Sequence, residues 1–162
     1  MADDLYDALK EFFVSNSAAA PVRALLVSGA TSVYEAGEID TGTLNTAEIA
    51  RRTAGNPAKC LLLTLQDAGE EPDDAHSGHF KQYAAIRIFD RGRAYTNLKA
   101  LRKAIKTALA DRPVVNVSIG SGRGLLDVRY DGRTGLRFDK TLDSHWEGIT
   151  VTAVLISAEF DN

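Results

Sequence analysis

The last third of the chain contains successive strand-like segments with no helix-length segment between them. Apolar runs of strand length occupy residues 113–119, 124–130, 136–138 and 148–160. Parallel neighbours need a crossover of a dozen or more residues, usually a helix, so these segments must pair mainly as antiparallel neighbours. This order favours an α+β fold over a doubly wound sheet. We expect a mixed, largely antiparallel β-sheet flanked by helices that pack on one of its faces.

Four amphipathic or capped stretches upstream predict helices. They cover residues 3–14, 21–28, about 46–54 with Thr46 as the N-cap, and 96–110. Residues 59–65 and 83–89 predict strands, and 31–37 predicts a short edge strand. The Asp-Gly pair at 131–132 favours a hairpin-like connection inside the last third.

The composition is that of one folded domain. The chain has 162 residues, of which 44% are hydrophobic and 25% are charged, so residues 1–162 are expected to form a single domain. No apolar run reaches the roughly 18 residues of a membrane helix, and the acidic N-terminus does not resemble a signal peptide. We therefore expect no membrane partner and assembly in the cytoplasm. The lone Cys60 lies in an apolar run and is expected to be buried.

Charge is distributed in two opposite blocks. Residues 66–79 carry five acidic residues and no Lys or Arg, and they predict a flexible acidic loop. Residues 80–112 carry nine Lys or Arg and two Asp, a local charge of +7. Such blocks influence association more than fold. The candidate subunit or partner interface therefore comprises Arg91, Arg93, Lys99, Arg102, Lys103, Lys106, Asp67, Glu70, Glu71, Asp73 and Asp74.

No group of residues forms a recognisable catalytic constellation. His76 and His79 lie beside Asp73 and Asp74, which are metal-ligand types, but no further anchored ligand is visible and a solvated polar loop is favoured. The sequence "GSGRG" at 120–124 lacks the residues of a phosphate loop and is interpreted as a connection between strands. We expect no enzyme, no cofactor and no metal.

Two further polar patterns have structural interpretations. His145 and Trp146 are expected to pack the indole at a turn or strand end. Acidic and basic residues alternate between 123 and 143, which suggests a solvated strand pair or a salt-bridged subunit contact. The acidic members are Asp127, Asp131, Asp139 and Asp143, and the basic members are Arg123, Arg129, Arg133 and Arg137.

The helix expected at 96–110 has two distinct faces. Its apolar residues fall in one arc, and Lys99, Arg102, Lys103 and Lys106 form a basic arc beside it. A solvated face and a contact with an acidic protein surface both remain open. Specific nucleic-acid binding is disfavoured, because Tyr95 is the only nearby aromatic residue and the chain carries a net charge of −3.

The order of these parts resembles the tail terminator (tail completion) proteins of long-tailed bacteriophages, the siphophages. The resemblance covers most of the chain and rests on the segments "LYDALKEFF", "PAKCLLLTL", "IRIFDRG", "NLKALRKAIKTAL" and "ITVTAVLISAEF". It implies a mixed sheet flanked by helices. It also implies a structural virion protein that forms a hexameric ring at the head-proximal end of the tail tube, ends tube polymerisation and docks to the head.

The resemblance implies several partners and no cofactor. They are other copies of the chain, the tail tube protein and the head–tail connector or stopper protein, and DNA passes through the lumen without specific binding. The acidic total charge agrees with such a lumen, because DNA affinity scales with the phosphates that are neutralised. A head-to-tail ring joins two different patches, which opposite charge blocks can specify. The alternatives are another neck component (a head-completion adaptor or stopper), a minor tail protein, or a small metal-dependent enzyme that uses His76 and His79.

Overall fold

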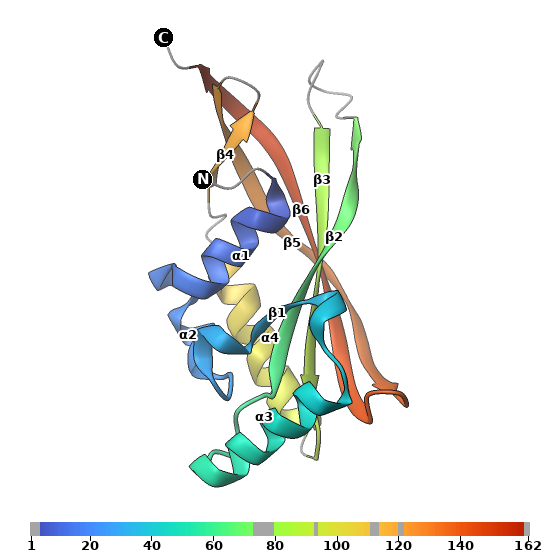
Figure 1. Cartoon of the computed structure of the whole chain (residues 1–162). Helices are drawn as coiled ribbons and strands as arrows, with labels where there is room; N and C mark the ends of the chain where they lie inside the picture. Colours follow the sequence, from blue (N-terminus) through green and yellow to red (C-terminus); the bar gives the residue numbers. More distant parts are fainter. Residues whose placement is uncertain (1–3, 73–79, 93, 111–113, 120–121, 161–162) are drawn as a thin grey trace.

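The protein is an α+β domain built on one six-stranded sheet (Figure 1). The computed structural model describes residues 4–72, 80–92, 94–110, 114–119 and 122–160. The helices are α1 (Leu5–Ser15), α2 (Ala20–Ala24), α3 (Thr41–Ala54) and α4 (Ala94–Ala110). The strands are β1 (Val33–Glu35), β2 (Leu62–Pro72), β3 (Phe80–Asp90), β4 (Val114–Ile119), β5 (Gly122–Asp139) and β6 (Ser144–Phe160). The expected fold class is confirmed.

The sheet is mixed, as predicted, with the strand order β1-β2-β3-β6-β5-β4. Strand β1 pairs with β2 in parallel, and every other neighbouring pair is antiparallel. The short edge strand expected within 31–37 is therefore confirmed as β1. The helix expected at 21–28 is shorter, because the chain leaves α2 at Leu25 and Leu26 forms a parallel bridge with Cys60.

Local capping explains where the helices begin and end. The Asp4 side chain accepts a hydrogen bond from the Asp7 backbone N–H at 2.9 Å and starts α1. Helix α3 begins earlier than predicted, because Asp40 and not Thr46 is its N-cap and shares a capping box with Thr43. It ends at Gly55, whose φ of +67° is the left-handed conformation that glycine adopts without strain.

The main core lies between three helices and one face of the sheet. Helices α1, α2 and α4 cover this face, which we call the helical face (Figure 1). Strand residues that point into it alternate along the chain, for example Leu63 and Leu65 in β2 and Ile86 and Ile88 in β3. Helix α4 contributes Leu98, Leu101, Ile105 and Leu109, so the predicted apolar arc is confirmed.

Helix α3 packs on the opposite face of the same sheet. Its buried Leu44 belongs to a second apolar cluster with Leu62 of β2 and Phe89 of β3, and Trp146 of β6 packs against that cluster. The expectation that the helices share one face is therefore wrong for α3. Two clusters form because β2 and β3 carry large apolar residues on both faces near α3.

The acidic segment is only in part what the sequence predicted. The predicted loop at 66–79 is wrong for residues 66–72, because β2 continues to Pro72 and pairs with β3 as far as Phe80. Backbone pairing with β3 sustains this part of the strand, although all of its side chains are exposed. Residues 73–79 lie outside the described residues.

The Asp-Gly pair at 131–132 does not form a hairpin. It lies within β5, where register shifts between Tyr130 and Gly132 and between Arg133 and Leu136 absorb the turn-like sequence as bulges. The chain reverses after Asp139 instead, and the Asp139 side chain accepts a hydrogen bond from the Leu142 N–H at 3.0 Å. The strand stays continuous through this turn-like sequence because β5 pairs with β6 on both sides of it.

Candidate functional site

The "FDRG" segment ends β3 in a buried polar network. Asp90 is fully buried and accepts hydrogen bonds from the Arg51 guanidinium, from the Arg91 backbone N–H at 2.8 Å and from Asn97 Nδ2 at 2.7 Å. Burial raises the pKa of Asp90 above its ordinary value, although the nearby Arg51 opposes that rise. Asn97 also donates to the Pro57 carbonyl at 2.9 Å. The network ties α3 and α4 to the end of the sheet.

The Arg91 side chain belongs to the same structural region. Its Nη1 atom donates to Asn45 at 2.6 Å and forms an ion pair with Glu48 at 2.9 Å, both on α3. Its other nitrogens donate to the Leu142 carbonyl at 2.8 Å and the Asp143 carbonyl at 2.9 Å. Only 12% of this side chain is exposed. Arg91, a candidate interface residue, is thus occupied by partners within its own chain.

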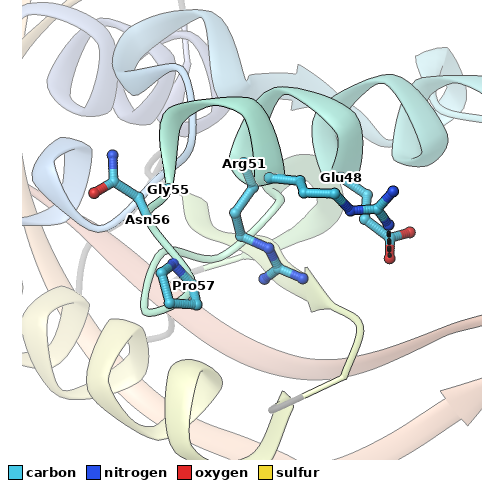
Figure 2. Close-up of a pocket in the computed structure, with 6 residues that line it drawn as sticks. Glu48, Arg51, Gly55, Asn56 and Pro57 are labelled. Atoms are coloured by element: carbon cyan, nitrogen blue, oxygen red, sulfur yellow. Dashed lines mark ion pairs between the residues drawn. The ribbon is translucent and has the colours of Figure 1, made fainter.

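An open hollow lies at the C-terminal end of α3 (Figure 2). Its volume is about 290 Å³, and its lining residues are Glu48, Arg51, Arg52, Gly55, Asn56 and Pro57. Figure 2 shows the Arg51 side chain turned away from α3. The charged groups of Arg52 and Glu48, which lie four residues apart on the helix, are separated by 3.9 Å. Because Arg51 is already bonded to Asp90, the hollow presents no free buried charge for catalysis.

The basic arc of α4 is divided between internal contacts and solvent. Arg102 forms an ion pair with Glu147 of β6 at 2.6 Å, and Arg133 of β5 meets the same carboxylate at 2.7 Å. The Lys106 ammonium lies 5.4 Å from the centre of the Tyr130 ring. Lys99 and Lys103 are exposed. These two lysines are therefore better candidates for contact with another molecule than Arg102.

The acidic candidates lie on a strand. Asp67 accepts a hydrogen bond from the Gly69 N–H at 2.8 Å at the β2 bulge, and Glu71 accepts one from the Tyr83 hydroxyl. This bond raises the pKa of Tyr83. Glu70 is exposed. The remaining candidates, Arg93, Asp73 and Asp74, lie outside the described residues, as do His76 and His79.

The other polar positions have packing partners. Trp146 lies under the Arg87 guanidinium at 4.5 Å from its ring centre, and the His145 ring meets Phe138 edge-on at 4.9 Å. Cys60 is buried, as predicted, and burial raises its pKa, which disfavours the nucleophilic thiolate. Asp127 and Arg129 form an ion pair within β5. Within the described part of the chain, no three His, Cys, Asp or Glu side chains gather as metal ligands.

Two unpaired strand edges are the feature that the sequence did not reveal. Strand β1 pairs only with residues 63–65 of β2, so residues 66–72, the β2 edge, have no strand on their outer side in the described structure. Strand β4 pairs only with residues 122–127 of β5, which leaves residues 128–139, the β5 edge, unpaired in the same way. Leu136 and Phe138 on the β5 edge are 45% and 50% exposed. In the sequence, Leu136 and Phe138 alternate with charged residues, which is a strand pattern, but the Asp-Gly pair at 131–132 upstream favours a turn.

Comparison with protein-family models gave no match, and comparison with curated proteins gave none either. No helix among the described residues is both long and apolar enough to cross a membrane.

Proposed function

We propose that the chain is a structural virion protein that forms a ring, a hexamer, at the head-proximal end of a siphophage tail tube. In this role it ends tube polymerisation and provides the surface that docks to the head connector. The observation that carries the proposal is the fold. A mixed sheet with helices on its faces is the architecture that the resemblance to tail terminators implies.

The use of charge inside the domain supports the same proposal. The buried carboxylates of Asp90 and Glu147 are bonded to arginines from other elements, so they join the sheet to α3 and α4. Lys99 and Lys103 remain exposed on α4, where they can meet an acidic protein surface. This distribution suits a rigid building block whose outer surface makes the specific contacts.

The test is a tube-length assay. The tail tube protein of the same virus is polymerised with and without the purified chain, and tube lengths and ends are examined by electron microscopy. The proposal expects shorter tubes with the protein at one end only. Unchanged lengths and bare ends would refute the terminator role, and binding to the isolated connector without binding to tubes would instead assign the chain to the stopper class.

A further inference from the structure

The two unpaired edges lie at opposite corners of one sheet. Glu71 on the β2 edge is level with Lys81 of β3, Val154 of β6 and Asp127 of β5, where β4 pairing ends. The other end of the sheet carries Leu136–Asp139 of the β5 edge, which pair with β6 residues 144–147. Both edges display backbone N–H and C=O groups that have no strand partner among the described residues.

Strand directions allow the two edges to pair between copies in the same orientation. From β2 to β3, β3 to β6 and β6 to β5 the chain direction reverses each time, so β5 is antiparallel to β2. A neighbouring copy placed beside the first without rotation in the sheet plane thus presents its β5 edge antiparallel to the first copy's β2 edge. Such pairing continues the hydrogen-bond pattern that already holds most of the sheet together.

Charge selects this pairing over pairing of like edges. The β2 edge carries Asp67, Glu70 and Glu71 without a basic residue, a charge of −3. Two β2 edges placed side by side would repel, because like charges directly opposite destabilise a strand pair. The β5 edge carries three arginines and two aspartates, a net +1, and it offers exposed Leu136 and Phe138 for burial.

Side-chain parity gives the register. Glu71 pairs with Lys81 of β3, so these two side chains lie on the same face of the sheet. Ala84 and Ile86 of β3 point into the main core, and Lys81 is an odd number of residues from each of them. Glu71 and Lys81 therefore lie on the face opposite the main core. Arg137 is opposite Trp146, which packs with α3 on that same face. The bulges leave Gly69–Pro72 and Leu136–Asp139 as regular runs at the two edges. In an antiparallel pair of these runs, Glu71 can lie directly across from Arg137.

We propose that the β2 edge of one copy pairs with the β5 edge of a second copy, with Glu71 opposite Arg137, so that the sheet continues from subunit to subunit. The inference rests on the proposed function, because it names the contact through which the ring would form. The interface is heterologous, so repetition of the same contact builds a ring or a filament. Successive copies are offset by roughly 30 Å along the strands, and a closed ring with such an offset requires strands inclined to its axis, as in a barrel.

Site-directed cross-linking tests the contact. A Glu71→Cys variant and an Arg137→Cys variant, each in a Cys60→Ala background, are mixed and oxidised, because Cα atoms of facing residues in antiparallel strands lie within disulfide range. We expect a disulfide-linked dimer from the mixture and none from either variant alone. The matched control mixes Glu71→Cys with Lys103→Cys, whose thiol is exposed on α4. No dimer at any concentration, a dimer from one variant alone, or an equal yield in the control would overturn the pairing.

Charge exchange gives a second readout that does not depend on oxidation. Glu71→Lys and Arg137→Glu should each weaken self-association measured by analytical ultracentrifugation about tenfold, because each replaces an opposite-charge pair with a like-charge pair. The double variant Glu71→Lys/Arg137→Glu should regain the affinity of the unmodified chain. A double variant as weak as the sum of the single changes would contradict the assigned register.

The outcomes separate this inference from the proposed function. If the chain caps tail tubes but the Glu71→Cys and Arg137→Cys variants never cross-link, the terminator role stands and the edge pairing is wrong. If the thiols cross-link specifically but tubes grow unaffected, the pairing stands and the terminator role is wrong.

Discussion

The contact between Arg51 and Asp90 provides the sharpest test of how the domain holds together. Arg51 is replaced by Met, which keeps much of the unbranched apolar part of the side chain and removes the guanidinium charge. Asp90 is then left fully buried without its cationic partner, and the Arg51 hydrogen bonds to the Lys59 and Arg91 carbonyls, at 2.9 and 3.1 Å, are lost as well. Breaking a buried pair in this way costs about 3–5 kcal/mol. We expect a loss of that size in the free energy of unfolding at neutral pH.

Urea denaturation followed by circular dichroism measures the loss. The matched control is Arg52→Met, because the neighbouring Arg52 side chain is 79% exposed and lies 3.9 Å from Glu48. An exposed pair of this kind contributes about 0–1 kcal/mol. Adding Asp90→Asn to Arg51→Met should recover part of the stability, because it removes the unpaired charge.

The pH dependence has a definite sign. Burial already raises the pKa of Asp90, and removal of Arg51 removes an opposing contribution, so the pKa rises further. A folded-state pKa above the unfolded value favours folding while the group is protonated, and this contribution is lost as pH rises through the folded pKa. The penalty of Arg51→Met should therefore be smaller at acidic pH than at neutral pH. A loss similar to that of Arg52→Met, or one that is independent of pH, would refute the reasoning.

Three other predictions follow from separate contacts. Arg102→Met should cost about 1.5–3 kcal/mol of unfolding free energy by removing a charged hydrogen bond to the buried Glu147, and a loss no larger than that of Lys103→Met would contradict it. Backbone and side-chain hydrogen bonds from Thr43 lower the pKa of the Asp40 carboxyl below its ordinary value of 3.8. The ionised Asp40 carboxylate therefore stabilises the fold above pH 3.8, and this stabilisation is lost as the pH falls through the lowered pKa. The destabilisation of Asp40→Ala, measured by thermal unfolding, should therefore fade in acid, and a constant difference would oppose this. If α4 contacts an acidic partner, Lys99→Glu/Lys103→Glu should reduce binding to tail tubes without lowering the melting temperature, whereas unchanged binding would restrict α4 to a solvated role.

The sequence predicted the elements whose signals are local. The apolar arc of α4, the buried Cys60 and the mixed sheet follow from periodicity and from the lack of crossover helices. The prediction of a loop at residues 66–72 was wrong, because backbone pairing with β3 holds them as a strand although they have no apolar face. The prediction of a turn at Asp131–Gly132 was also wrong, because bulges in β5 accommodate these residues within its pairing with β6.

The candidate interface was the least predictable part of the chain. Charge counts could not distinguish Arg91 and Arg102, which have carboxylate partners within the domain, from the exposed Lys99 and Lys103. That distinction depends on tertiary neighbours more than 40 positions away in the chain, such as Glu48 for Arg91 and Glu147 for Arg102. The unpaired edges depend on where β1 and β4 end relative to their neighbours, which no local pattern specifies.

Electron microscopy of tail tubes mixed with the purified chain tests the central claim most directly. The measurement is the number of copies at a tube end and the arrangement of their strands. We predict one six-fold ring at a single end, in which the β2 edge of each copy pairs with the β5 edge of the next. Bare tube ends, or a ring whose copies meet through other surfaces, would contradict the account.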